Sequence, residues 1–391
     1  MKQSELTRRA FLQKSALGAS ALAMGVGSRA RAGEEEKEVA LGVIGVGGRG
    51  SHLLRKAARI EGVRIVAVCD LLTNKVADGQ DIAKKANPKN DPKGYTRFQE
   101  MLEKEKLDGV IVATEVGNHA KCAAPVLDAG FNCFCEKPMD TTVERVDAIV
   151  KAARKAKGFL QVGFQRHYNV GYVKAIERIH KGDLGKVSFL QGHWHWPWNI
   201  GGGWVSDMDL GGGELVEQAG HHMDVMAWVM KYEHPIECTA MANISRNISP
   251  DSKPISEDHS AVLFRFPGNV VFSYTHIFYA PQVWQDELMW AYGQNWGVDL
   301  VKSELYQGDK AVVPLGEGSG TDWDKGTDTE LEAFVEKIRK GDKEKPLSNV
   351  ETARIATLMC LMGREAFRDV KSNTFRTKIV TWKDLGTTTD L

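Results

Sequence analysis

The chain has few cysteines, no cluster of basic residues after its N-terminus, and no net charge over its 391 residues. The cysteines show no metal-ligand spacing, and the H-E-x-x-H pattern of zinc-binding helices is absent, so we expect no metal site. Without a concentration of Lys and Arg, nucleic acid is not an expected partner. The six cysteines are Cys69, Cys122, Cys133, Cys135, Cys238 and Cys360.

The zero net charge hides a basic N-terminus. Residues 1–32 contain paired arginines at Arg8-Arg9, then the weakly apolar run 15–27, then an A-x-A sequence ending at Ala32. These features predict a twin-arginine signal peptide and an exported, periplasmic or extracytoplasmic protein. An amphipathic N-terminal helix is the alternative. The apolar run is too short and too rich in alanine and glycine for stable membrane insertion.

Twin-arginine export moves folded proteins, so this chain would fold in a reducing cytoplasm. Cys69 falls in a predicted buried strand, and Cys133 and Cys135 share one face of another. Free, buried thiols are therefore expected rather than disulfides.

A glycine-rich turn is the strongest motif. Gly45-Val46-Gly47-Gly48-Arg49-Gly50 follows the predicted strand 39–44 and precedes a predicted helix at 51–59. The next predicted strand, 63–69, ends at Asp70, twenty residues after Gly50. Such glycines let a backbone approach a pyrophosphate at a helix N-terminus, and the acid can bind ribose hydroxyls. We expect NAD as cofactor. NADP is less expected because its 2′-phosphate would meet Asp70.

The length predicts two domains after the signal. Strands and helices alternate from 38 to about 160, which predicts an α/β Rossmann domain with a doubly wound parallel sheet over 33–160. Residues 161–391 are rich in β-runs, which predicts an α+β substrate-binding domain with an open, mostly antiparallel sheet. One helix at 214–230 should interrupt this sheet. Helices at 329–340 and 350–369 should pack back on it and on the first domain.

The tripeptide Glu136-Lys137-Pro138 follows the predicted strand 132–135. It therefore falls at the carboxyl edge of the parallel sheet, where ligands bind. An ammonium there could act on a substrate oxygen beside the nicotinamide. A surface lysine before a turn is the alternative.

A polar stripe follows three glycines. After Gly211-Gly212-Gly213, the side chains of Glu217, His221, Asp224 and Trp228 fall on one face of the predicted helix, and apolar residues flank them. Buried carboxylates and imidazoles cluster at functional sites, which favours a catalytic stripe. A metal shared by Glu217 and His221 is the rival interpretation.

Aromatic residues gather between 193 and 204. Trp194, Trp196 and Trp204 could stack on sugar rings or form an aromatic core. Thr114 and His119, after the strand that ends at Ala113, are weaker candidates for the cofactor site. Arg166, at the domain junction, is a weaker candidate for substrate binding.

Together these motifs resemble the glucose–fructose oxidoreductase, inositol dehydrogenase and MocA family. The resemblance implies Lys137 as the catalytic lysine, His221 as the catalytic histidine, and Glu217 at the family's usual aspartate. Ala219 replaces the family's usual Gly, and Glu115 stands where Pro is frequent. Cofactor-binding positions are then Gly45, Gly47, Gly48, Arg49, Gly50, Asp70, Thr114, His119, Glu136 and Lys137. Substrate-binding candidates are Arg166, Trp194, Trp196, Trp204 and Asp224.

The resemblance implies an NAD(P)-dependent oxidoreductase acting on a hydroxyl of a sugar or sugar derivative. An exported enzyme would retain its cofactor between turnovers. A redox-neutral glycoside hydrolase acting through a transient 3-keto sugar is the alternative, and a non-catalytic NAD-holding protein is a third. A homo-oligomer formed through the second-domain sheet is also implied.

Overall fold

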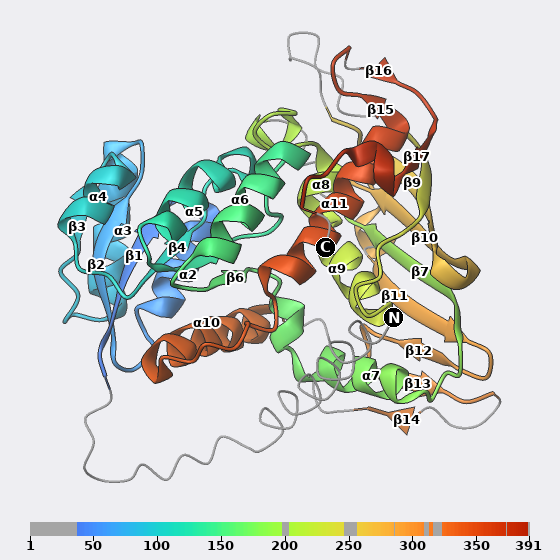
Figure 1. Cartoon of the computed structure of the whole chain (residues 1–391), viewed down its shortest axis with the longest axis horizontal. Helices are drawn as coiled ribbons and strands as arrows, with labels where there is room; N and C mark the ends of the chain where they lie inside the picture. Colours follow the sequence, from blue (N-terminus) through green and yellow to red (C-terminus); the bar gives the residue numbers. More distant parts are fainter. Residues whose placement is uncertain are drawn as a thin grey trace. The chain divides into compact units, whose positions relative to one another are not determined.

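The computed structural model describes residues 37–197, 203–245, 256–284, 286–308, 313–315, 323–372 and 374–389. The elements below all belong to one compact unit, Glu38–Leu391. Two sheets organise it (Figure 1). The predicted signal peptide lies outside the described residues.

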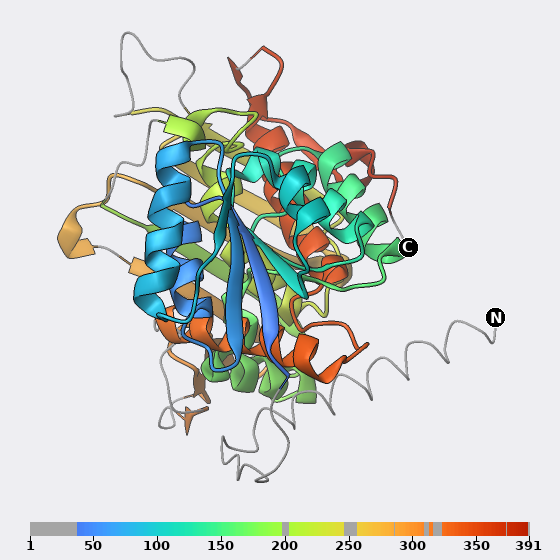
Figure 2. The ribbon, with the colours of Figure 1, turned by 90° about the vertical axis from the view of Figure 1, so that its left-hand side faces the viewer.

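The first sheet has six parallel strands in the order β3-β2-β1-β4-β5-β6. Its central strands are buried apolar runs, as expected of a sheet covered on both faces. Figure 2 shows these strands between helices on either side. The elements are β1 Val39–Ile44, α2 Gly48–Ala57, β2 Val63–Cys69, α3 Thr73–Ala86, β3 Lys93–Tyr95, α4 Phe98–Lys104, β4 Gly109–Val112, η1 Val116–Asn118, α5 His119–Asp128, β5 Asn132–Cys135, α6 Val143–Lys155 and β6 Leu160–Val162.

The second sheet has nine strands in the order β14-β13-β12-β11-β7-β10-β9-β8-β17. Its pairings are antiparallel except for β7 with β10, which run parallel. This confirms the predicted fold class: a Rossmann sheet followed by an open, mostly antiparallel sheet. The strands are β7 Val187–His195, β8 Glu237–Asn243, β9 His259–Phe266, β10 Val270–Ile277, β11 Asp286–Gly293, β12 Gly297–Asp299, β13 Glu304–Tyr306, β14 Val313–Pro314 and β17 Ile379–Thr381.

The remaining elements connect or cover the sheets. They are η2 Gln165–Tyr168, α7 Val170–Lys181, η3 Gly203–Ser206, α8 Glu214–Gln218, α9 Gly220–Val229, η4 Pro267–Asn269, η5 Gln282–Trp284, α10 Trp323–Lys340, α11 Val350–Phe367, β15 Arg368–Asp369, β16 Thr374–Phe375 and η6 Trp382–Leu385. The prediction of one helix over 214–230 was wrong, because the chain breaks at Ala219 into α8 and α9. The prediction of a helix starting at 329 was also too late, since α10 begins at Trp323.

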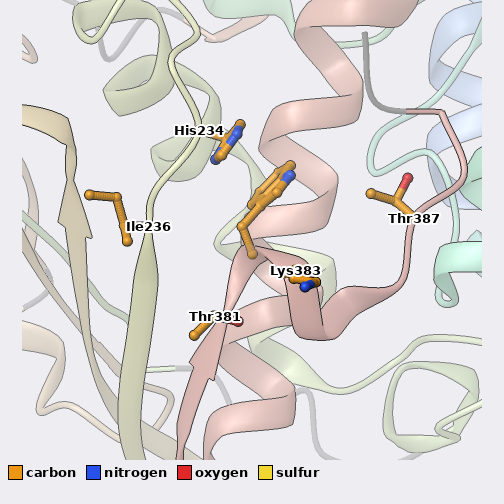
Figure 3. Close-up of a pocket in the computed structure, with 6 residues that line it drawn as sticks. His234, Ile236, Thr381, Lys383 and Thr387 are labelled. Carbon is orange, nitrogen blue, oxygen red and sulfur yellow. The ribbon is translucent and has the colours of Figure 1, made fainter.

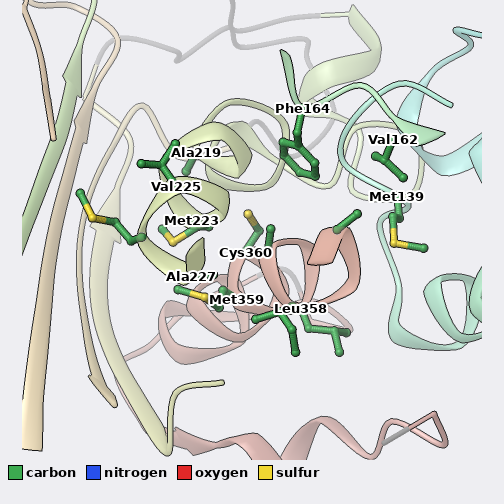
Figure 4. Packing of buried hydrophobic residues seen from close by; sticks show 14 of the residues in the cluster. Met139, Val162, Phe164, Ala219, Met223, Val225, Ala227, Leu358, Met359 and Cys360 are labelled. Carbon is green, nitrogen blue, oxygen red and sulfur yellow. The ribbon is translucent and has the colours of Figure 1, made fainter. Parts of the chain in front are cut away.

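The core of the second domain lies between its sheet and the pair α9 and α11. Figure 4 shows Met223, Val225 and Ala227 of α9 packed near Met359 and Cys360 of α11. Strand β10 alternates buried and half-buried residues, so one face of the sheet meets these helices. The other face leaves apolar side chains in solvent.

Helix α10 packs on the first sheet although it follows the second in sequence. Phe334 of α10 meets the rings of Phe134 and Phe159 edge-to-face, at centroid distances of 5.8 and 5.5 Å. Burying such aromatic pairs is worth roughly 1 kcal/mol each beyond their area. Helix α10 therefore contributes to the core of the first domain although it lies late in the chain.

All six cysteines are buried with free thiols. Among the described residues, no helix is both long and apolar enough to cross a membrane.

Candidate active site

The glycine turn has the shape that a pyrophosphate requires. Gly45 has φ +89°, and a Cβ there would lie 2.5 Å from the Ala113 carbonyl oxygen. A Cβ at Gly50 would collide with the Gly45 carbonyl oxygen. A Cβ at Gly47 or Gly48 would instead meet no atom within 4 Å. Gly45 and Gly50 thus let the backbone fold tightly, while Gly47 and Gly48 leave open space before the N-terminus of α2, where a diphosphate fits.

Asp70 stands at the end of β2, beside this turn. Its carboxylate accepts hydrogen bonds from Val46 N at 2.8 Å and Leu72 N at 3.0 Å. These bonds fix the carboxylate next to the glycine turn, and its remaining lone pairs can accept ribose hydroxyls.

Arg49 is held by carboxylates rather than left open to solvent. Its Nε lies 2.6 Å from Glu136 Oε1, and one terminal nitrogen lies 3.1 Å from Glu330 Oε1. Burial raises the pKa of Glu330 well above its usual value, while Arg49 opposes that rise. Glu136 also accepts a bond from the Lys137 backbone nitrogen at 3.0 Å. Arg49 and Glu136 therefore join the glycine turn, the end of β5 and α10.

His119 connects two loops at the same edge. Its Nδ1 lies 2.8 Å from the Pro138 carbonyl oxygen, and its Nε2 lies 3.2 Å from the Thr114 carbonyl oxygen. The Thr114 hydroxyl donates to the Glu115 carbonyl at 3.2 Å. Both imidazole nitrogens are thus engaged by protein, so His119 orients the loops that carry Thr114 and Lys137.

Lys137 follows β5 and precedes a cis peptide bond to Pro138. Its ammonium lies 2.6 Å from the Glu217 carbonyl oxygen and 3.0 Å from Glu217 Oε1. Both side chains are largely buried. The carboxyl edge of the first sheet therefore meets α8 of the second domain through a charged pair.

His221 lies in the first turn of α9, beside Lys137. A Cβ placed on the preceding Gly220 would be 3.9 Å from Lys137 Cδ, so the lysine stem runs along this turn. The imidazole packs edge-on to Phe164 at 6.1 Å and near Trp194 at 6.3 Å. His221 is 8% exposed, and its buried Nδ1 has no hydrogen-bond partner within the described ranges.

Asp224 is fully buried and bound to a histidine of the domain junction. Its carboxylate lies 2.9 Å from His167 Nε2. The Tyr232 hydroxyl lies 3.0 Å from the same nitrogen, and the His167 ring stacks on Trp228 at 4.3 Å. Asp224 and Trp228 thus belong to a network that anchors α9.

Arg166 is buried against Glu287 of β11, with which it forms an ion pair. Its guanidinium also lies over the Trp194 ring at 5.9 Å.

His222, the residue after His221, donates to the His193 carbonyl oxygen at 3.1 Å, and burial lowers the pKa of His222 well below 6.5. His222 is therefore a neutral residue of the core.

The predicted aromatic residues differ in their exposure to solvent. Trp194 is buried and meets Trp196 edge-to-face at 6.0 Å. Trp204 is 39% exposed. Trp194 thus forms part of the wall behind His221, and Trp204 keeps a face available to a ligand. Trp198 and Asn199 lie outside the described residues.

The structure thus brings Lys137, Glu217 and His221 together at the carboxyl edge of the first sheet. The sequence did not single out Glu287, Glu257 and Glu330, although these residues bind side chains of the site or lie next to it. Glu287 lies on the same face of β11 as the buried Met289 and Ala291, and this inward register was the available signal.

A separate pocket of about 410 Å³ lies elsewhere (Figure 3). It contains none of the predicted site residues. Its lining residues are His234, Ile236, Thr381, Trp382, Lys383 and Thr387.

Comparison with known proteins identifies the family of both domains. Residues 39–164 match the model of an oxidoreductase family with an NAD-binding Rossmann fold. Residues 172–295 match the GFO/IDH/MocA C-terminal domain. The two matches together span more than half of the chain.

Inositol 2-dehydrogenase of Salmonella paratyphi B is 29% identical over 49% of this chain, and the match spans 55% of that enzyme's length. Inositol 2-dehydrogenase of Klebsiella pneumoniae is 25% identical over 78% of this chain and 88% of its own length. An Agrobacterium radiobacter oxidoreductase, solved with NAD⁺, L-tartaric acid and magnesium, shares the fold. Its TM-score is 0.69 at 13% identity, covering 89% of this chain and 99% of that chain.

The glycine turn, the Lys137–Glu217 contact and both family matches lead to one conclusion: the chain belongs to the Gfo/Idh/MocA family of NAD(P)-binding oxidoreductases.

Proposed function

We propose that this chain oxidises a hydroxyl of a sugar or sugar derivative and retains its nicotinamide cofactor between turnovers. The observation that carries the proposal is the contact of Lys137 with Glu217 beside His221, at the edge where the glycine turn is open. The inositol dehydrogenases among the relatives support a polyhydroxylated substrate.

Each residue has a distinct role. His221 accepts the proton of the substrate hydroxyl. Lys137 stabilises the negative charge that develops on that oxygen. Glu217 holds the ammonium in place through the 3.0 Å contact. The bound nicotinamide would supply the hydride acceptor.

NAD is the proposed cofactor, and NADP is the less favoured one. Asp70 ends β2 where the adenosine ribose would lie, and its carboxylate is held rigid by Val46 N and Leu72 N. A 2′-phosphate there would face a fixed negative charge, and Leu71 and Leu72 provide no cation.

We also propose export by the twin-arginine route and assembly into a homo-oligomer. The export proposal rests on Arg8-Arg9 and the sequence around Ala32. The assembly proposal rests on the apolar residues that the second sheet exposes on its outer face, which include Met241, Leu263 and Ile379. Light scattering of purified protein, with Leu263→Lys compared with wild type, tests this assembly.

The first experiment is to purify the protein without added nucleotide, denature it, and identify any released cofactor. Sugars, inositols and aryl glycosides are then added to native protein while the absorbance of reduced nicotinamide is followed. Bound NAD that a free polyol reduces and a second carbonyl compound reoxidises supports the proposal. Glycoside cleavage without lasting reduction would establish the redox-neutral hydrolase instead. Binding without any reaction would favour the non-catalytic protein.

A further inference from the structure

Glu214, the first residue of α8, is a carboxyl group without a counterion. It is 1% exposed, and neither side-chain oxygen has a hydrogen-bond partner of normal geometry. It lies three residues before Glu217, so both side chains project from the same side of the helix.

The charged groups around Glu214 are engaged with other partners. Glu257 accepts a bond from Leu215 N at 2.9 Å and pairs with Arg368 at 3.2 Å. Glu217 pairs with Lys137. Ser256 and Asp258 flank Glu257, and the nearby Arg364 contacts the Gly212 carbonyl and Glu365. Glu214 is therefore surrounded by carboxylates, and the cations nearby are directed at other partners rather than at Glu214.

Burying an ionised carboxylate without a partner costs several kcal/mol, so such a group keeps its proton instead. Burial, followed by repulsion from Glu257 and Glu217, raises the pKa of Glu214 to about 9. The approach of Ser256 opposes this rise only weakly. At neutral pH Glu214 is thus a carboxylic acid, whereas Glu217 Oε1 lies 3.0 Å from the Lys137 ammonium.

We propose that Glu214 is a positioning residue whose uncharged form keeps a second anion away from Glu217 on α8, so that Glu217 holds the Lys137 ammonium, and that ionisation of Glu214 sets the alkaline limit of the reaction. The role in the reaction rests on the function proposed above. A second carboxylate on this side of α8 would repel Glu217. The ion pair that holds the catalytic lysine would then lose its geometry.

The first test is the pH dependence of stability in the full-length protein and in Glu214→Gln. Between the unfolded pKa of about 4.5 and the folded pKa of about 9, the folded state keeps a proton that the unfolded state has lost. Rising pH therefore destabilises the wild type across this window. Glutamine has the same shape but cannot ionise, so E214Q should melt at a higher temperature, and the difference should grow with pH.

The second test is the pH profile of turnover with whichever polyol the wild type oxidises. E214Q should keep kcat within roughly threefold near neutrality. Above a pH of about 9 the wild type should lose activity roughly tenfold per pH unit, and E214Q should lack this limb. Glu237→Gln, at a more exposed glutamate of the same domain, is the matched control and should behave as wild type in both tests.

Two results would overturn the proposal. One is a melting temperature that varies with pH equally in wild type and E214Q. The other is a folded E214Q that loses kcat by 100-fold or more near neutrality, which would make Glu214 a proton donor.

A second measurement applies if E214Q does not fold. In infrared spectra of glutamate-labelled wild type, a protonated carboxyl band that titrates near a pH of about 9 supports the proposal, and the absence of such a band refutes it. If no polyol is oxidised, the proposed function fails, while the melting comparison still decides the state of Glu214.

Discussion

The ammonium of Lys137 and the carboxylate of Glu217 lie 3.0 Å apart, although eighty residues separate them in sequence. Lys137 follows a strand of the first sheet, and Glu217 belongs to a helix of the second domain. The predicted catalytic group is therefore complete only when both domains are folded and joined.

Replacing Lys137 with Met should reduce turnover by about 10³-fold or more, because the charge that stabilises the substrate oxygen is lost. Binding of NAD⁺, measured by calorimetry, should change little. Lys121→Met removes an exposed lysine and is the control. Normal turnover by K137M would refute the role assigned to Lys137. A double-mutant cycle with Glu217→Gln should show strong coupling, since either change alone leaves a buried charge unpaired.

Substitutions of the adjacent residues His221 and His222 should change different properties of the protein. His221→Asn should lower kcat by about 10²–10⁴-fold with little change in melting temperature, because it removes the proposed base. His222→Asn should chiefly lower stability, by about 1–3 kcal/mol, since it disturbs a buried bond to the His193 carbonyl. Steady-state kinetics and thermal melts of both variants test this, and the reverse pattern would exchange the two roles.

Stability should also fall in acid. Burial lowers the pKa of His222 well below 6.5 and that of His276 to about 3. Below a pH of about 6.5, the pKa of these histidines in the unfolded chain, the unfolded state binds protons that the folded state does not bind, so acid favours unfolding. Each histidine contributes up to about 1.4 kcal/mol per pH unit in this window. Denaturant melts between about pH 4 and 7 should show the loss, and His276→Gln should lessen it.

Two glycine substitutions separate cofactor binding from folding. Gly47→Ala should fold normally, because its Cβ meets no atom within 4 Å and its φ is −74°. It should weaken NAD⁺ binding by about tenfold or more by filling space that the diphosphate needs. Gly50→Ala should instead destabilise the fold, since its Cβ would strike the Gly45 carbonyl oxygen. Unchanged affinity in G47A would place the diphosphate elsewhere.

Asp70→Ser should weaken NAD⁺ binding and narrow the preference over NADP⁺, because it removes both the ribose acceptor and the charge that repels a 2′-phosphate. The variant keeps a short acceptor for Val46 N, so the turn should remain folded. Titration calorimetry with both nucleotides measures the ratio. Equal binding of NAD⁺ and NADP⁺ by wild type would show that Asp70 does not select.

The local patterns in the sequence predicted five of the six strands of the first sheet, but not the edge strand β3. Strands β2 and β5 have the predicted bounds because each is a short apolar run between turn residues. The sequence was less informative for the second domain. The strands β11, β12 and β13 were not predicted, and β7 pairs in parallel with β10, because pairing order depends on contacts between distant segments.

The sequence by itself determined the chemistry that is present: the glycine turn, the acid after β2, and Lys137, Glu217 and His221. The turn, the acid and Lys137 follow from local rules of turn geometry and strand ends, whereas the helix periodicity that grouped Glu217 with His221 is interrupted at Ala219. Only the tertiary structure decided which of these groups are engaged and by what. It bound Arg166 to Glu287, Asp224 to His167 and Arg49 to Glu136. It also buried Glu214 without a counterion, because burial and ion pairing depend on packing between segments far apart in the chain.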